Sequence, residues 1–252
     1  MLSIVRKKYG VPINDIFFAS DPDQTDSSAP IAFFNQAKRP LDHFKPVKTA
    51  IIDLRRDLGD IFANLSSNTR YKIRRAERDG TTTEVLERPN DEELSSFISF
   101  FDRFAELKRV SGSNRDKLRA LRDNAALLLF RAKDRANLTS VAHAYIADRE
   151  SSRIRLLYSA SHFRASDDTE VRNRVGRANR LLHWFEIESA KRLGFTDYDL
   201  GGLPIDDRDP VKNAIARFKS EFGGRHQIEY NGLTSSNPII KSCLPLIKRI
   251  MR

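Results

Sequence analysis

This sequence of 252 residues lacks cysteine pairs, histidine clusters and long apolar runs. Its single cysteine, Cys243, excludes an internal disulfide and a cysteine-based metal cluster. The five histidines form no H-x-x-x-H or similar ligand set, so we expect no metal site. No apolar run is long enough to cross a membrane, and no long apolar segment follows the basic start MLSIVRKKYG. We therefore expect a cytoplasmic protein without stable membrane insertion.

The net charge is the most informative feature of the composition. Lys and Arg number 44 against 34 Asp and Glu, which gives a formal net charge of +10. Such a balance favours an anionic partner, whether nucleic acid, an anionic membrane surface or a phosphorylated small molecule. Because both signs are abundant and no basic tail stands out, a dedicated DNA-binding protein is disfavoured. A basic surface with no specific partner is the alternative.

Apolar periodicity and turn signals predict alternating strands and helices from residue 49 onward, whereas prolines interrupt residues 1–46. Pro89-Asn90-Asp91 is the best internal boundary, since Asp91 can cap the helix that follows. We therefore divide the chain into an N-terminal region, 1–90, and a main domain, 91–252. The predicted strands are 49–54, 81–86, 126–132, 139–147, 153–161, 196–200 and 227–230. The predicted helices are 62–76, 92–108, 115–124, 177–193, 211–222 and the tail from 238.

The string RVGRANRLLHW (174–184) predicts an anion site. It places Gly176, Arg177, Asn179 and Arg180 just ahead of the apolar helix predicted from residue 177. Backbone N–H groups at a helix N-terminus attract phosphate. The planar guanidinium group of arginine can donate two parallel hydrogen bonds to phosphate oxygens. We expect these four residues to bind the phosphates of a donor. The alternative is an ordinary helix start with surface arginines.

A second string, YDLGG (198–202), ends an apolar strand with Gly201 and Gly202, where a ligand can approach closely. Asp199 lies at that strand end, and ligands collect at such ends in open α/β sheets. It could accept an amine proton or hold a sugar hydroxyl. It could equally cap the loop that follows.

Histidine and arginine supply the remaining candidates. His183 could act as a base at neutral pH, although a hydrogen-bonded core histidine is the simpler reading. His143 and His162 are weaker candidates for a base. Arg70, Arg74 and Arg78 form one i, i+4 row, which most often means a solvated helix face.

The order of elements after Asp91 resembles the layout of GNAT-type acyltransferases, whose cofactor diphosphate binds at the start of the central helix. Their loop reads Arg/Gln-x-x-Gly-x-Gly/Ala, and Asn173-x-x-Gly176-x-Ala178 matches it except at the first residue. The resemblance implies a mixed, mostly antiparallel sheet flanked by helices, an α/β (α+β) fold.

A wider match is to the Fem-type peptidyltransferases. It rests on NTRYKIRRAERDG (68–80), YDLGG and FKSEFGG (218–224), and covers about residues 49–230. That family has two GNAT-like units and adds amino acids to cell-wall precursors from aminoacyl-tRNA. This chain has room for one unit and an abbreviated N-terminal part. GRANRLLHW is more similar to shorter relatives that acylate nucleotide-linked amino sugars from acyl-CoA.

The resemblance also implies roles for individual residues. Lys219 corresponds to the lysine that Fem-type enzymes place near the reacting carbonyl, and Phe218 beside it would contact the substrate, as would Gly201 and Gly202. Arg70 and Arg74 would meet a nucleotide diphosphate or tRNA phosphates.

We expect an N-acyltransferase that joins an acyl group from acyl-CoA to a nucleotide-linked amino sugar for cell-surface polysaccharide synthesis. The neighbouring alternative is aminoacyl transfer from aminoacyl-tRNA to a cell-wall precursor. A non-catalytic RNA-binding module is a third possibility. It is disfavoured because aromatic residues are not interleaved with the basic runs.

Overall fold

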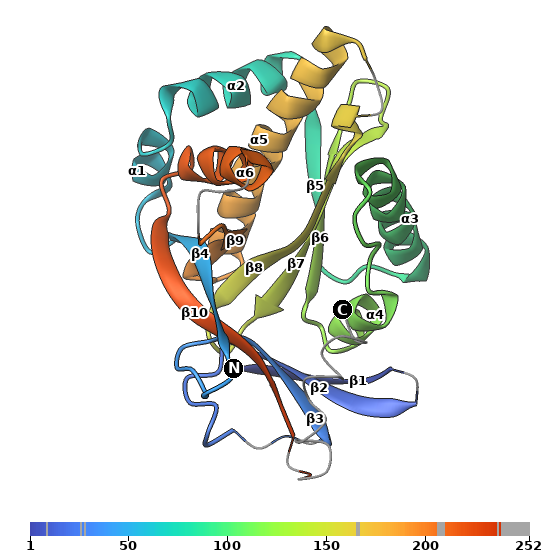
Figure 1. The fold of residues 1–252 in the computed structure, drawn as a ribbon. Coiled ribbons are helices and arrows are strands. Elements are labelled where there is room, and N and C mark those ends of the chain that lie inside the picture. Colours follow the sequence, from blue (N-terminus) through green and yellow to red (C-terminus); the bar gives the residue numbers. More distant parts are fainter. Residues whose placement is uncertain are drawn as a thin grey trace.

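A single ten-stranded sheet forms the centre of the molecule (Figure 1). The structure is a computed structural model, and it describes residues 1–8, 10–25, 27, 29–164, 167–205, 210–235 and 237. The strand order is β1-β2-β3-β10-β4-β9-β8-β7-β6-β5. Only the pairs β2–β3 and β8–β9 are parallel. The strands are β1 (Leu2–Lys8), β2 (Val11–Phe17), β3 (Ile31–Ala37), β4 (Lys45–Asp53), β5 (Thr82–Leu86), β6 (Leu127–Lys133), β7 (Thr139–Asp148), β8 (Arg153–Ser161), β9 (Asp197–Leu203) and β10 (Arg225–Thr234).

Helices cover the sheet on both faces. On one face, α1, α2 and α5 pack against β6 to β9, with Phe218 of α6 beside them, in the larger apolar core. On the other face, α3 and α4 close a second core with β1, β6, β7 and β8. The helices are α1 (Leu58–Ala63), α2 (Ser67–Arg78), α3 (Asp91–Lys108), α4 (Arg115–Asp123), α5 (Thr169–Arg192) and α6 (Pro210–Ser220), with a short 3-10 turn η1 (His162–Arg164).

Local sequence signals explain why most of these elements lie where the periodicity predicted them. The single helix predicted over 62–76 is instead two helices, α1 and α2, because Ser66 caps a new helix start. A capping box starts α3, in which the Asn90 side chain accepts from Glu93 N and the Glu93 carboxylate accepts from Asn90 N. Ser66 caps α2 and Asn114 caps α4 in the same manner. The mixed, mostly antiparallel sheet flanked by helices is therefore confirmed.

The predicted start of the central helix at residue 177 is wrong. Helix α5 begins at Thr169, where the Asp168 side chain accepts from Glu170 N and Val171 N. Residues 169–172, which are mostly polar and carry no apolar periodicity, form the first turn of this helix. Gly176 consequently lies inside the helix, where its N–H belongs to the intrahelical ladder. No helix N-terminus exists at Gly176, so backbone N–H groups of a helix start are not available there to bind phosphate.

Residues 1–46 supply three strands that the sequence did not indicate. β10, from the C-terminal part of the chain, lies between β3 and β4 and pairs antiparallel with both. The sheet thus contains strands from both predicted parts of the chain, 1–90 and 91–252. The division into these two domains stays a prediction. Within the described residues, no helix is both long and apolar enough to cross a membrane. Cys243 and the helix predicted from residue 238 lie outside the described residues.

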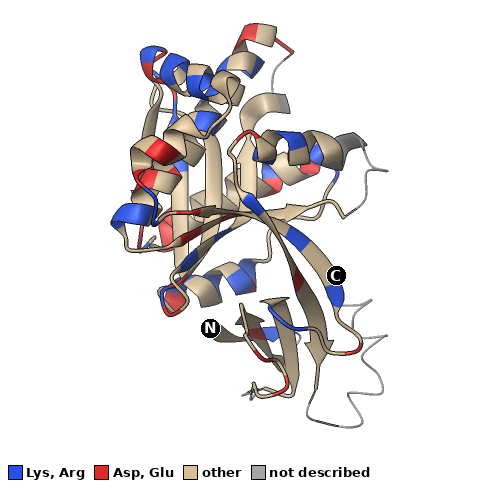
Figure 2. Cartoon of the chain, turned by 90° about the vertical axis from the view of Figure 1, so that its left-hand side faces the viewer, with Lys and Arg blue, Asp and Glu red and all other residues tan. Residues whose placement is uncertain are grey.

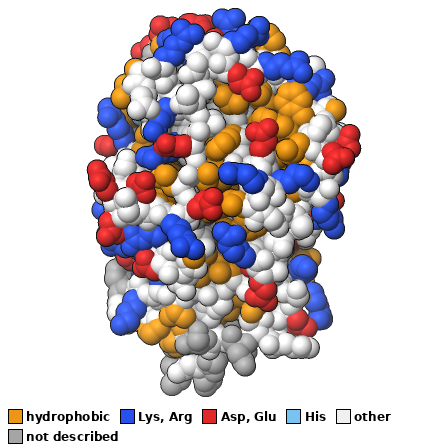
Figure 3. Space-filling view, turned by 180° about the vertical axis from the view of Figure 1, so that it is seen from behind, with side chains coloured by type: hydrophobic (Ala, Val, Ile, Leu, Met, Phe, Trp, Pro, Cys, Tyr) orange, Lys and Arg blue, Asp and Glu red, His pale blue; other side chains and the backbone are white. Residues whose placement is uncertain are grey.

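Both signs of charge are mixed over the surface. The face opposite to that of Figure 1 carries interspersed basic, acidic and apolar side chains (Figure 3). This mixture agrees with the high counts of both charges, and it explains why the net charge alone does not locate a binding site.

Candidate functional site

The central opening of the molecule lies where two parallel strands part. β8 and β9 pair only at Arg153↔Asp197, Ile154↔Tyr198 and Arg155↔Asp199. Beyond this point β8 continues to Ser161 and β9 to Leu203 without pairing to each other. A cavity of about 600 Å³ fills the gap. Its walls include side chains from α5 and α6 on one face of the sheet and from α3 on the other.

The cavity is basic. Among the described residues that line it, Lys108, Arg155, Arg180 and Lys219 are cationic, and none is Asp or Glu. Apolar side chains such as Leu156, Val175 and Phe218 form much of the remaining wall. An elongated, partly apolar group that carries negative charge fits this lining best.

The cavity brings together most of the residues singled out from sequence. Of the twelve residues expected to bind donor or substrate or to act in catalysis, eight line it: Gly176, Asn179, Arg180, His183, Gly201, Gly202, Phe218 and Lys219. Four lie elsewhere: Arg70, Arg74, Arg177 and Asp199. The eight come from three separate sequence strings, so α5, β9 and α6 converge on one place.

The four outlying residues already have partners. Arg177 pairs with Asp79 at 2.8 Å and with Glu170 at 2.9 Å. Arg70 donates to the carbonyl oxygens of Ala63 and Leu65, where it holds the turn before α2. Arg74 lies over the ring of Phe62. Of the four predicted donor-binding residues, Arg177 is therefore the one turned away from the cavity.

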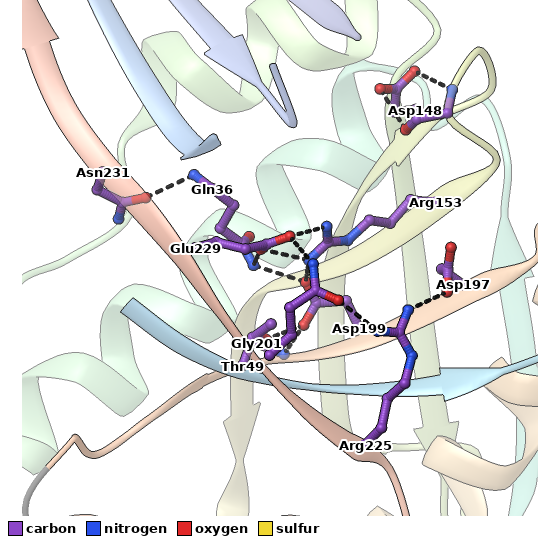
Figure 4. A network of polar contacts seen from close by, with 12 residues as sticks. Gln36, Thr49, Asp148, Arg153, Asp197, Asp199, Gly201, Arg225, Glu229 and Asn231 are labelled. Carbon is purple, nitrogen blue, oxygen red and sulfur yellow. Dashed lines mark hydrogen bonds and ion pairs between the residues drawn. The ribbon is translucent and has the colours of Figure 1, made fainter. Parts of the chain in front are cut away.

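Asp199 is buried in a polar network (Figure 4). Its carboxylate accepts hydrogen bonds from Thr49, from Gly201 N and from Nη2 of Arg153, the last at 2.6 Å. Burial acts to raise the pKa of Asp199, but Arg153 and Arg155 lower it overall, so the group is ionised. These partners occupy the Asp199 carboxylate within the protein, where it also accepts from the backbone of its own strand at Gly201 rather than from a loop after β9.

Lys219 reaches the cavity from α6. Its Nζ donates to Gly202 O at 2.7 Å. Burial lowers the pKa of Lys219 to about 8, with Asp199 opposing that shift and Arg155 adding to it. A lysine with this pKa is a hydrogen-bond donor at neutral pH and can lose its proton within the working range of an enzyme.

His183 belongs to a buried hydrogen-bond network centred on Glu186. The Glu186 carboxylate accepts from His143 at 2.6 Å, from Tyr145 at 2.6 Å and from Tyr198 at 2.7 Å. Nδ1 of His183 lies 2.9 Å from the same carboxylate. Burial alone would raise the pKa of Glu186, but the two histidines and their hydrogen bonds lower it well below its usual range.

The network fixes the tautomer of His183. Tyr198 Oη donates to Glu186, so its oxygen accepts Nδ1–H from His183 at 2.8 Å, while His143 presents its Nδ1–H to Glu186 directly. Both rings then keep their lone pair on Nε2. Burial lowers the pKa of His183, which keeps the ring neutral. His183 lines the cavity. The simpler reading of a hydrogen-bonded core histidine is confirmed, and it leaves the base role open.

His143, His183 and Glu186 could also be considered as ligands of a metal ion. One ligand atom from each of His143, His183 and Glu186 lies within 4.8 Å of the other two. The hydrogen bond from His143 Nδ1 to Glu186, and the hydrogen bonds of Tyr198 to both His183 and Glu186, already account for this closeness. The donor set therefore fits a hydrogen-bond network better than a metal centre.

Sequence reasoning missed Glu186, Arg153, Arg155 and Glu229. His183 and Glu186 are three residues apart on one helix, and that spacing could have indicated their contact. Arg153 bridges Asp199 and Glu229, the latter at 2.6 Å, and no local pattern predicts a contact over such separations in sequence.

Comparisons with known proteins give the fold. No family model and no curated protein matches the sequence. Among solved structures, the C-terminal domain of a protein assigned as a lysylphosphatidylglycerol synthetase from Agrobacterium fabrum is similar, with TM-score 0.59 and 13% identity, over 99% of this chain and 85% of that one. FemX is similar with TM-score 0.57 and 15% identity, over 81% of this chain and 64% of that chain. L-PGS from Bacillus licheniformis is similar with TM-score 0.55 and 16% identity, over 87% of this chain and 72% of that chain. At such low identity these likenesses show the fold, which this chain shares with Fem-type proteins.

Proposed function

We propose that this protein is an acyltransferase and that transfer takes place in the cavity between β8 and β9. The observation that carries the proposal is the parting of these strands after Arg155↔Asp199, which opens a basic, partly apolar cavity beside Lys219 and His183. A fold shared with FemX and L-PGS supports it.

The chemistry follows from these two side chains. The lone pair of an amine attacks the carbonyl carbon of a thioester, and a C–N bond forms as the C–S bond breaks. Lys219, protonated below its pKa of about 8, stabilises the negative charge on the carbonyl oxygen. Nε2 of His183 takes the amine proton and returns it to the leaving thiolate.

The donor in this proposal is acyl-CoA, and the acceptor is a nucleotide-linked amino sugar. Both carry phosphates, which suits a cavity whose described lining has four cationic side chains and no carboxylate. Gly176, Asn179 and Arg180 present one side of α5 to the donor. Arg180 is held in place by Glu221 at 2.8 Å and lies over Phe218.

Aminoacyl-tRNA is a second candidate donor, favoured by the surface beside the cavity. Lys and Arg gather on the helices at the top of the molecule, where α2 and the start of α5 lie (Figures 1 and 2). They are Arg70, Lys72, Arg74, Arg75 and Arg78 of α2, and Arg172 and Arg174 of α5. Such a surface attracts an RNA backbone. The absence of a helix start at Gly176 removes one argument for CoA.

Binding separates the two donors and the RNA-binding module. Thermal shifts are measured with CoA at millimolar concentration, with a nucleotide-linked amino sugar and with bulk tRNA over a range of salt. We expect CoA and the sugar to stabilise the protein, and Arg180→Gln to weaken the CoA effect. Arg192→Gln, at an exposed position on the same helix, serves as the control. Stabilisation by tRNA alone, with steep salt dependence, would contradict acyl-CoA as donor.

A further inference from the structure

Arg155 is a cavity side chain to which neither the sequence nor the proposed chemistry gives a role. It lies on β8 at the last residue pair before β8 and β9 part. Its side chain lines the cavity. Its Nε is enclosed by protein, and no described residue accepts a hydrogen bond from it.

The nearby carboxylates are already taken by another arginine. Arg153 donates to Asp199 at 2.6 Å and to Glu229 at 2.6 Å and 2.8 Å. Gln36 also donates to both carboxylates, as seen in Figure 4. Arg153 and Lys219 add positive charge close to Arg155. Burial lowers the pKa of Arg155, and Arg153 lowers it further, although Asp199 and Glu229 act in the opposite direction.

A buried cationic donor without an acceptor is costly to a fold, and such groups in native proteins call for an explanation. A guanidinium is a planar fork that matches the oxygens of a phosphate or a carboxylate. The cost is removed when a ligand brings such oxygens into the cavity. Arg153 differs because its Nη atoms donate to Asp199 and Glu229, although its Nε is likewise unpaired.

We propose that Arg155 binds an oxyanion, a phosphate or carboxylate group, of the acceptor substrate. This rests on the proposed function and deepens it. In the proposed function Lys219 marks the position of the reacting carbonyl, and both side chains line the cavity. A Cβ at Gly201 would lie 3.7 Å from Lys219 Nζ and 3.1 Å from the carbonyl oxygen of Leu156, the residue after Arg155. The diphosphate of CoA lies at the far end of a long arm from its thioester. The anion at Arg155 therefore belongs to the acceptor and lies near its amine.

The test uses two simple anions, inorganic pyrophosphate and malonate, which separate phosphate from carboxylate recognition. Calorimetric titration compares the wild type with Arg155→Gln, Arg155→Lys and the control Arg192→Gln. We expect one of the anions to bind the wild type and Arg192→Gln equally. Arg155→Gln should bind it at least about tenfold more weakly, the loss of one charge-assisted hydrogen bond. Arg155→Lys, which keeps the charge without the fork, should fall between them.

The variants should fold, because no described residue accepts a hydrogen bond from Arg155 Nε and Arg153 still donates to Asp199 and Glu229. A melting temperature of Arg155→Gln close to that of the wild type checks this. Equal anion affinity in wild type and Arg155→Gln overturns the subsite, as does failure of both anions to bind the wild type.

The titration needs no donor and no turnover, so its result tests the anion subsite independently of the proposed acyl transfer. Anion binding that depends on Arg155 in a protein without acyl transfer upholds the subsite and rejects the reaction. Conversely, acyl transfer with an acceptor KM that Arg155→Gln leaves unchanged upholds the reaction and rejects the subsite.

Discussion

Lys219 shows how burial tunes a single side chain. Its pKa is lowered to about 8 in the folded protein, chiefly by burial, whereas a lysine in the unfolded chain keeps a pKa near 10.4. Between these values the unfolded state binds more protons, so the free energy of unfolding rises with pH in this window. Below pH 8 the buried charge costs stability.

We therefore expect Lys219→Met to stabilise the protein at pH 7, by on the order of 1–2 kcal/mol after solvent screening. The gain should shrink as pH rises from about 8 to 10.5. Urea unfolding across this pH range measures it, with the exposed Lys45→Met as control. Lys219→Met should also lose acyl transfer, whereas Lys45→Met should keep it. A stability difference that does not change with pH would contradict the buried charge.

Glu186 is the residue on which the orientation of His183 depends. Replacing it with Gln leaves four surrounding donors with an amide that both donates and accepts. We expect Glu186→Gln to lower the free energy of unfolding by about 3 kcal/mol or more, as when a buried ionic network is broken. Glu106→Gln, an exposed glutamate on α3, should change it by less than about 0.5 kcal/mol. Denaturant unfolding compares them, and equal effects would contradict the network.

At the scale of elements, the parting of β8 and β9 depends on the backbone of β9. Gly201 has φ +77°, and a Cβ there would lie 3.1 Å from Leu156 O and 3.7 Å from Lys219 Nζ. A Cβ at Gly202 would meet no heavy atom within 4 Å. The two neighbouring glycines thus differ in what they tolerate.

Gly201→Ala should cost about 1 kcal/mol from the left-handed backbone alone, and it should also reduce acyl transfer by crowding Lys219. Gly202→Ala is the matched control and should leave both properties close to the wild type. Melting temperature and transfer rate measure the pair. Indistinguishable variants would mean that this bend of β9 does not shape the site.

The sequence predicted part of this site and missed the rest for physical reasons. Gly201, Lys219 and His183 stood in recognisable strings. The start of α5 was misplaced because Ser166–Arg172 is polar and an aspartate cap can also belong to a loop. Arg155 and Glu229 were missed because burial and pairing across strands leave no local pattern.

For the whole molecule, the sheet joins the two ends of the chain. β10 lies between β3 and β4, and β9 pairs with β4. The predicted elements from residue 49 onward were largely correct because each carries its own periodicity. The strands of residues 1–46 were not predicted, since β1 (LSIVRKK) mixes exposed charges with apolar residues at the edge of the sheet.

We expect this continuous sheet to unfold as one unit. Deleting residues 1–53 removes both neighbours of β10, so the remaining chain should not fold. Circular dichroism and calorimetry of the whole chain should give a single transition in which van't Hoff and calorimetric enthalpies agree. A folded 54–252 fragment, or two separate transitions, would contradict the single unit.

The central claim is acyl transfer in the cavity between β8 and β9. The most direct measurement is mass spectrometry of a nucleotide-linked amino sugar incubated with acetyl-CoA and either the wild type or Lys219→Met. We predict an N-acetylated sugar with the wild type and at least about a hundredfold less with Lys219→Met, as for loss of an oxyanion donor. Equal product from both proteins, or no product from a folded wild type with acetyl-CoA or with aminoacyl-tRNA in its place, would contradict the claim.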